Sequence, residues 1–115
     1  MENSIIEEKA LDFAVRIVNL YKYLTNTKSE YVMSKQLLRS GTSIGANVAE
    51  GERGQTKPDF TWRMSVALKE ANETSYWLTL LHRTEFLSDK EFESLHRDIK
   101  EIIAILTAIC KTATQ

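Results

Sequence analysis

The fold of this chain is decided by the stretch Arg39-Ser-Gly-Thr-Ser-Ile-Gly-Ala-Asn-Val-Ala-Glu-Gly51, which is richer in small residues than any other part of the sequence. A glycine inside a helix costs about 1 kcal/mol relative to alanine, so this stretch needs tertiary contacts to be helical. Gly41, Gly45 and Ala49 are spaced four residues apart and therefore share one helix face. That face predicts a groove that lets the backbone of a neighbouring helix approach closely.

A ligand site is the alternative interpretation of the same stretch, with bare backbone and the side chains of Asn47 and Glu50 as its binding groups. A phosphate-binding loop is not indicated, because the pattern GxxxxGK[ST] is absent and the glycines do not follow a strand. Glu50, Glu70 and Glu73 could also face one another between two helices. Buried carboxylates need partners, here Arg39, Asn47 or Arg63. We favour a structural polar network over acid/base catalysis.

Hydrophobic residues recur every three or four positions through four segments, which is the pattern of amphipathic helices. Helix starts are predicted at three capping boxes, Ser4/Glu7, Thr27/Glu30 and Ser88/Glu91, and at Thr56, which is followed by Pro58 and Asp59. The first helix is expected to end near residues 25–27 and the second at Gly51 or Gly54. Short turns between long helices favour antiparallel neighbours. The sequence therefore predicts an all-α, antiparallel up-down-up-down four-helix bundle that forms a single domain over residues 1–115.

Composition agrees with a globular helical protein, with 43% hydrophobic residues, one Pro and four Gly in 115 residues. Cys110 is the sole cysteine and lies on an apolar stripe, which predicts a buried thiol. The N-terminus lacks a basic segment followed by an apolar one, and the apolar run 102–110 is too short to span a bilayer. We expect a cytoplasmic protein that does not enter a membrane.

Charge is unevenly distributed along a chain whose net charge is −1. Residues 28–69 carry seven Lys and Arg against four Asp and Glu, a net +3. This mildly basic segment predicts at most weak nucleic-acid binding, and a solvated mixed surface is the favoured interpretation. Any contacts with nucleic acid would come from Lys35, Arg39, Arg53, Lys57, Arg63 and Lys69.

The third helix carries more large apolar residues than one inner face can bury. Trp62, Val66, Tyr76 and Trp77 do not all fit its inner stripe. They indicate either an oligomer interface or aromatic residues that cover the edge of the core.

Catalytic and metal-binding patterns are weak. Glu93-x-x-His96 matches half of the paired motif of a di-metal bundle, but Thr79 stands where the second motif needs a glutamate before His82. No GxSxG nucleophile elbow occurs. We therefore predict no catalytic residue, no metal, no cofactor and no small-molecule substrate.

The middle of the chain resembles a known bacterial family. Gln36-Leu-Leu-Arg39, the run 43–51, Phe60, Ala67 and Glu73 are similar to the four-helix-bundle family named for the 23S rRNA intervening sequence, also labelled S23 ribosomal protein. The resemblance covers nearly the whole chain and implies a ring-like homopentamer. The residues that match its motif are Arg39, Ser43, Ile44, Gly45, Asn47, Glu50, Gly51 and Glu73.

One branch of that family resembles the accessory protein of diversity-generating retroelements, a basic pentamer that binds nucleic acid and a reverse transcriptase. This chain has Lys69-Glu70 where many relatives have Gly-Ser, and it lacks that branch's basic character. We therefore expect a non-catalytic, homo-oligomeric, pentameric binding or scaffold protein. The alternative is a nucleic-acid-binding accessory protein that acts with a reverse transcriptase or with ribosomal RNA.

Overall fold

Four helices form an antiparallel bundle in the computed structural model, which describes residues 4–113. They are α1 (Ile5–Asn26), α2 (Met33–Glu52), α3 (Lys57–Arg83) and α4 (Asp89–Ala113). The bundle measures 44 × 22 × 20 Å. Within the described residues there is no strand, so the all-α four-helix architecture predicted from the sequence is confirmed.

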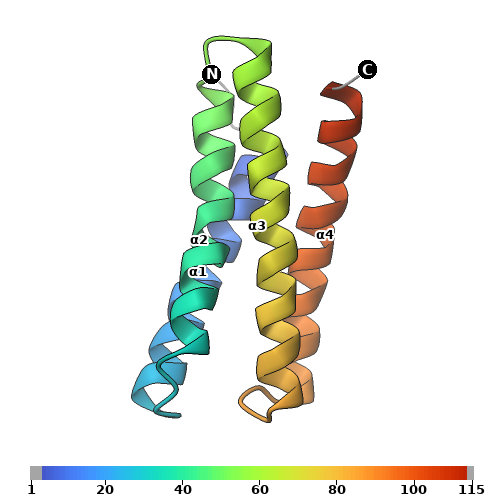
Figure 1. Ribbon diagram of the computed structural model, residues 1–115. Helices are drawn as coiled ribbons and strands as arrows, with labels where there is room; N and C mark the ends of the chain where they lie inside the picture. Colours follow the sequence, from blue (N-terminus) through green and yellow to red (C-terminus); the bar gives the residue numbers. More distant parts are fainter. Residues whose placement is uncertain (1–3, 114–115) are drawn as a thin grey trace.

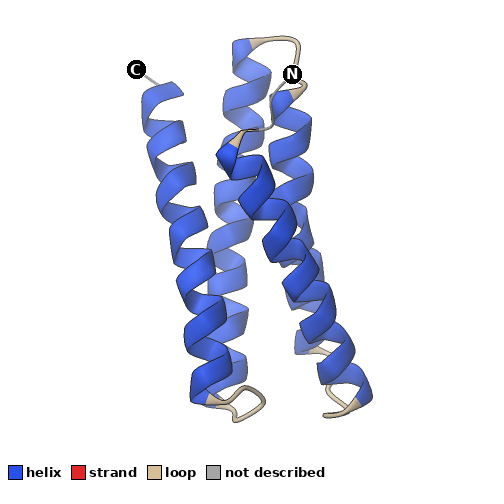
Figure 2. Cartoon of the chain, turned by 180° about the vertical axis from the view of Figure 1, so that it is seen from behind, coloured by secondary structure: helices blue, strands red, loops and turns tan. Residues whose placement is uncertain are grey.

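The helices follow one another around the bundle, and α1 and α4 make the smallest contact of the four adjacent pairs. Figure 1 shows α2, α3 and α4 in front, with α1 behind them. Seen from the other side, α1 is inclined to α2 and α3, and the last turns of α4 extend past the first turn of α1 (Figure 2). Among the described residues, no helix covers the outer side of α3, which faces the viewer in Figure 1.

The core is built from the apolar stripe of each helix, because residues three or four apart share a face. Phe13 and Ile17 of α1 are fully buried in this core, and Ile17 lies next to Gly41 of α2. The other fully buried large side chains are Leu24, Leu37, Ile44, Val48, Met64, Leu78, Leu81, Ile99, Ile102 and Leu106.

Three of the predicted helix starts are confirmed. Ser4 Oγ accepts a hydrogen bond from the Glu7 N–H at 3.1 Å. Thr56 caps α3 in the same way, with Pro58 in the first turn. Ser88 and Glu91 exchange both bonds of a capping box, at 2.9 and 3.1 Å. These side chains satisfy backbone donors that would otherwise lack partners.

The predicted capping box Thr27/Glu30 is wrong, because α2 begins later, at Met33. Thr27 instead ends α1, and its N–H donates to the carbonyl of Tyr23. The carboxylate of Glu30 folds over the start of α2 and accepts from the N–H groups of residues 32, 33 and 34 at 2.7–3.1 Å. Glu30 still caps α2, but its side chain reaches forward to the helix and does not reach back to Thr27. The predicted end of the first helix is confirmed, at Asn26. The second helix continues through Gly51 to Glu52 and is capped by Arg53, so it ends between the two predicted glycines and at neither of them.

Candidate functional site

The small-residue motif lies inside the protomer, between α2 and its two neighbours. A Cβ added at Gly41 would lie 2.8 Å from Cγ2 of Ile17, and one at Gly45 would lie 3.5 Å from the carbonyl oxygen of Ala10. Gly51 faces α3, where an added Cβ would meet Met64 at 2.8 Å. The glycines thus bring α2 close to both α1 and α3. The motif serves helix packing, and α1 occupies the groove that the alternative reading assigned to a ligand.

The seam between α2 and α3 carries a polar network centred on Arg39. Its guanidinium forms ion pairs with Glu70 at 3.1 Å and with Glu73. Trp77 Nε1 donates to the same Glu73 carboxylate at 3.1 Å. Arg39 is about half exposed, whereas the Glu70 side chain is only 12% exposed. The network links two helices at the protein surface, as the sequence-based interpretation of a structural polar network predicted.

Glu50 does not join this network. It is exposed and lies eleven residues after Arg39 on the same helix. At 1.5 Å per residue this is about 16 Å along the axis, too far for a shared contact. The hypothesis that Glu50, Glu70 and Glu73 face one another is therefore wrong for Glu50.

A second polar contact crosses the same seam at Asn47. Its side-chain oxygen accepts from Arg63 at 3.1 Å, and its amide donates to the carbonyl of Ser43 at 2.8 Å. The Arg63 guanidinium also lies over the ring of Trp62, 4.7 Å from its centroid. Asn47 thus connects the small-residue motif to an aromatic side chain on the outside of α3.

A third contact, between Ser40 and Thr74, was missed by the sequence analysis. Both side chains are fully buried, and their hydroxyls form a hydrogen bond of 3.0 Å. Thr74 sits between Ala71 and Leu78 on the inner stripe of α3. The sequence signal that could have indicated this contact is a hydroxyl residue on the inner stripe of each of the two helices.

The six basic residues weighed for nucleic-acid contact do not act as six free charges. Arg39 and Arg63 take part in the seam contacts described above, and Arg53 pairs with Glu7 of α1 at 3.0 Å. Lys57 lines an apolar hollow, while Lys35 and Lys69 are exposed on α2 and α3. Half of the predicted set is thus engaged within the protomer.

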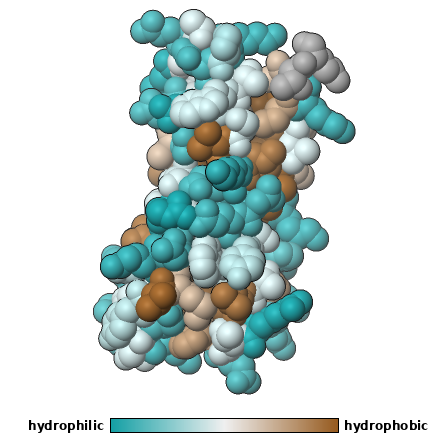
Figure 3. All heavy atoms as spheres, viewed as in Figure 1, coloured by the Kyte–Doolittle hydropathy of each residue, from teal (hydrophilic) through white to brown (hydrophobic). Residues whose placement is uncertain are grey.

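The outer side of α3 presents the large apolar residues that the sequence singled out. Trp62 is 58% exposed and Tyr76 is 59% exposed, whereas Val66 and Trp77 are half-buried. Tyr76 and Trp77 pack edge to face, with ring centroids 5.1 Å apart. Figure 3 shows this side of the molecule with a hydrophilic band across its middle and hydrophobic patches above and below.

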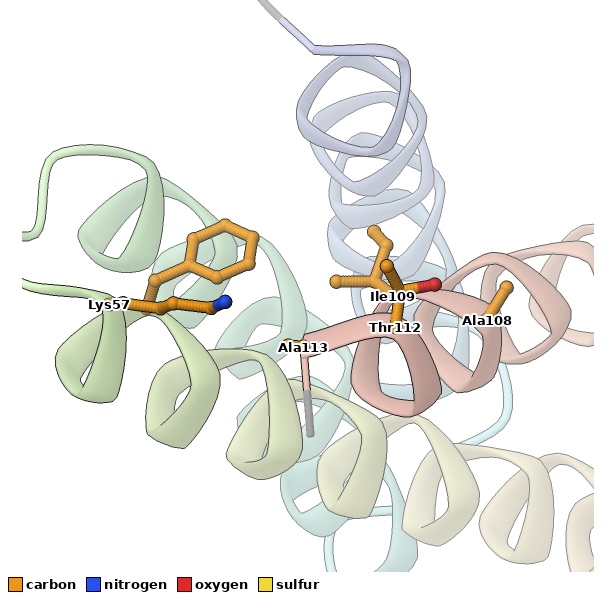
Figure 4. A pocket seen from close by; sticks show the side chains of 6 residues that line it. Lys57, Ala108, Ile109, Thr112 and Ala113 are labelled. Atoms are coloured by element: carbon orange, nitrogen blue, oxygen red, sulfur yellow. The ribbon is translucent and has the colours of Figure 1, made fainter. Parts of the chain in front are cut away.

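An apolar hollow of about 450 Å³ lies between the start of α3 and the end of α4. It is lined by Lys57 and Phe60 of α3 and by Ala108, Ile109, Thr112 and Ala113 of α4 (Figure 4). The hollow lies where the last turns of α4 extend past the first turn of α1 (Figure 2). Its wall offers few polar groups to orient a ligand.

Three rings stack at the opposite end of the bundle, where α3 and α4 are joined. Phe92 lies between His82, at a centroid distance of 4.2 Å, and His96, at 4.8 Å. His82 Nε2 also lies 2.7 Å from a carboxylate oxygen of Asp89. Burial lowers the pKa of His96, and the positive charge of Lys100 adds to this shift.

The half-motif Glu93-x-x-His96 does not place its two side chains in one site. Glu93 is exposed, while His96 stacks on Phe92. In the described part of the chain, residues 4–113, no three His, Cys, Asp or Glu side chains are grouped so that they could hold a metal ion.

Cys110 is half-buried near the end of α4, and burial raises the pKa of its thiol.

Across residues 4–113, every helix is too short or too polar to cross a membrane.

Comparison with protein families places the chain. Residues 2–108 match the family described as 23S rRNA-intervening sequence protein. The chain belongs to this family.

A solved structure supports that assignment. It is the crystal structure of a protein of unknown function from the S23 ribosomal protein family of Bacteroides thetaiotaomicron VPI-5482. The two chains are 55% identical and superpose with a TM-score of 0.91, over 93% of this chain and 99% of the other. A comparison with curated proteins found no match. The fold and the family expected from the resemblance are therefore confirmed.

Proposed function

We propose that this chain is a non-catalytic, homo-oligomeric helical-bundle protein that works in the cytoplasm as a binding or scaffold component. The observation that carries the proposal is the outer side of α3, where Trp62 and Tyr76 are each more than half exposed. Large aromatic side chains that stay exposed on one helix face are typical of protein interfaces. The pentameric ring implied by the family resemblance is the assembly we propose.

The polar residues weighed for catalysis support a structural role. Arg39 is paired with Glu70 and Glu73, and Asn47 with Arg63, across the seam of two helices. Removing one member would leave its partner's charge or polar group without a contact and loosen the seam. These residues therefore hold α3 in the orientation that turns its aromatic face outward.

Paired substitutions test the role of that face. We expect the double variant Trp62→Ser, Tyr76→Ser to lower the mass of the assembly measured by light scattering at micromolar concentration, because it removes the two most exposed rings of α3. The control is Tyr31→Ser, Val32→Ser, which removes two large side chains that are at least as exposed, in the connection between α1 and α2. Equal masses for wild type and both variants would show that α3 is not an interface.

A nucleic-acid-binding accessory protein is the second candidate, favoured by the net +3 of residues 28–69 and by the family's description. Exposed Lys35, Lys57 and Lys69 could contact phosphates in an assembly, where linked weak contacts reinforce one another. Arg39 and Arg53 are already paired with carboxylates, which weakens this candidate.

We expect weak or no binding of generic RNA and DNA at about 0.15 M salt, with a steep salt dependence. Charge reversal at Arg39, Arg53 and Lys57 should reduce whatever binding remains. A fluorescence anisotropy titration that gave sub-micromolar affinity at this ionic strength would make the accessory-protein function the better one.

A further inference from the structure

We propose that each copy packs the outer side of its α1 against the outer side of α3 of the next copy, head to tail around the ring. This contact rests on the proposed homo-oligomer and names the surface that covers α3. A closed ring needs two different surfaces on every protomer, because a surface that binds itself joins copies only in pairs. The outer side of α3 is one of these surfaces, and α1 offers the other.

The outer side of α1 also carries large apolar side chains that stay exposed. Ile5, Leu11 and Val15 are each more than half exposed. Leu11, Val15 and the half-buried Val18 are spaced four and three residues apart, so they share one side of the helix, opposite its buried stripe. Figure 2 shows α1 nearest to the viewer, and no helix lies over this side among residues 4–113. An aliphatic surface is therefore open on α1, as an aromatic one is on α3.

The two surfaces lie on a diagonal of the bundle and both extend toward α4. In the described chain the neighbouring pairs are α1–α2, α2–α3, α3–α4 and α1–α4. Asp12 of α1 lines a small pocket with Asp98 and Glu101 of α4. An apolar hollow beside Trp62 of α3 reaches Ala113 of α4. Surfaces that lean toward the same side of a bundle are inclined to each other, as a closed ring requires, whereas directly opposite surfaces would continue as an open chain.

The heights of residues along the bundle decide which side chains meet. In a ring whose axis runs along the bundles, rotation leaves each residue at its own height. Gly45 of α2 faces Ala10 of α1, and Ser40, five residues earlier on α2, bonds to Thr74 of α3. Because α2 and α3 run antiparallel, Gly45 is level with the residue five positions before Thr74, which is Lys69. Ala10 and Lys69 are therefore at the same height.

Opposite charges meet at this height. Lys69 is on the outer side of α3, and Glu8 and Asp12 are each two residues from Ala10 on α1. All three charged side chains are exposed, and within the described part of the chain none of them forms an ion pair. The lysine of one copy therefore meets two carboxylates of the next. Either surface paired with itself at equal height would instead bring like charges together, which is unfavourable.

Apolar side chains meet on both sides of this charged contact, since both helices rise about 1.5 Å per residue. Ile5 lies five residues before Ala10 and is level with residue 64 of α3, at the edge of the apolar hollow beside Trp62. That hollow has a volume of about 600 Å³. Val18 lies eight residues after Ala10 and is level with residue 77, next to Tyr76. Each exposed ring of α3 thus receives an aliphatic side chain of α1.

A double-cysteine variant tests the contact. Asp12→Cys and Lys69→Cys are placed in one chain with Cys110→Ala, and the protein is treated with a short bis-maleimide. We expect a ladder of covalent species at successive multiples of 13.2 kDa, because each copy is joined to one neighbour through residue 12 and to the other through residue 69. The matched control moves the second cysteine to Lys35, an exposed lysine of α2, and should give no ladder.

A charge swap checks the central ion pair. We expect Lys69→Glu to raise several-fold the protomer concentration below which the assembly dissociates, measured by light scattering on dilution, because it gathers three carboxylates. Adding Asp12→Lys to the same chain should return this concentration toward the wild-type value, since the charges are opposite again. Lys35→Glu makes the first change on α2 and should have no effect. A swap that restores nothing would overturn the pairing of these two residues.

The remaining outcomes of the crosslinking overturn the contact. Products that stop at two protomers would indicate a surface that binds itself. A protein that gives no covalent species, but whose mass by light scattering exceeds one protomer, would remove the α1–α3 contact and leave the proposed homo-oligomer standing. A protein that gives no covalent species and has the mass of one protomer would remove both. Both cysteine sites are exposed, so circular dichroism of each variant should match that of the wild type, and this is checked first.

Discussion

Two helix faces of this protein, the α1-facing side of α2 and the outer side of α3, are opposite in character. On α2, Gly41 and Gly45 let α1 approach until an added Cβ would lie 2.8 Å from one neighbouring atom and 3.5 Å from another. On α3, Trp62 and Tyr76 are large and stay more than half exposed. The face with small residues is closed within the protomer, while the face with large residues is open.

This difference separates what specifies the fold from what specifies partners. A stripe of small residues has little side chain to bury. It stabilises the fold only when another helix approaches closely, and α1 does so. A stripe of aromatic and charged residues can be covered only by another molecule. We infer that α2 determines how the bundle closes and that α3 determines what the bundle binds.

The largest effect is expected where α2 meets α1 most closely. Gly41→Ala should lower the free energy of unfolding by about 1–2 kcal/mol, because the new methyl group overlaps the stiff, β-branched side chain of Ile17. Urea unfolding followed by circular dichroism measures this change.

Gly45→Ala is the matched control for that variant. It adds the same methyl group to the same helix, but at ordinary contact distance from Ala10, so we expect stability to stay equal or to rise by about 0.5–1 kcal/mol. If both variants changed the free energy of unfolding equally, the closer approach of α1 at Gly41 would not be what makes that position sensitive.

A smaller effect is expected at the start of α2, which sets the position of both glycines relative to α1. Glu30→Ala should cost about 1 kcal/mol, since three backbone N–H groups lose their acceptor. Glu91→Ala removes an exposed carboxylate that accepts a single N–H, and should cost less. Equal losses in thermal unfolding would show that the Glu30 cap contributes no more than an ordinary surface cap.

The fold was predictable because local signals agree with the tertiary structure. Helical periodicity, the caps at Ser4, Thr56 and Ser88, and the small-residue stripe all point to the same bundle. The start of α2 was not predictable in this way. A glutamate three residues after a threonine matches the capping-box pattern whichever way its side chain turns. Glu30 turns forward, and the chain between α1 and α2 is therefore longer than expected.

The polar surface was only partly predictable. The partners of Arg39 depend on which positions of α2 and α3 face each other. Sequence spacing reduces the number of possible partners but does not select one. Ser40 and Thr74 meet in the core because α2 and α3 lie so close that two short hydroxyl side chains touch. Such a contact depends on the distance between helices, and periodicity along one helix carries no information about that distance.

The mass of the native protein in solution tests the central claim most directly. A protomer weighs 13.2 kDa. We propose that another copy covers the outer face of α3, so native mass spectrometry and light scattering at micromolar concentration should both give a multiple of this mass. A single protomer mass by both methods, in a protein whose circular dichroism shows a folded bundle, would contradict the account.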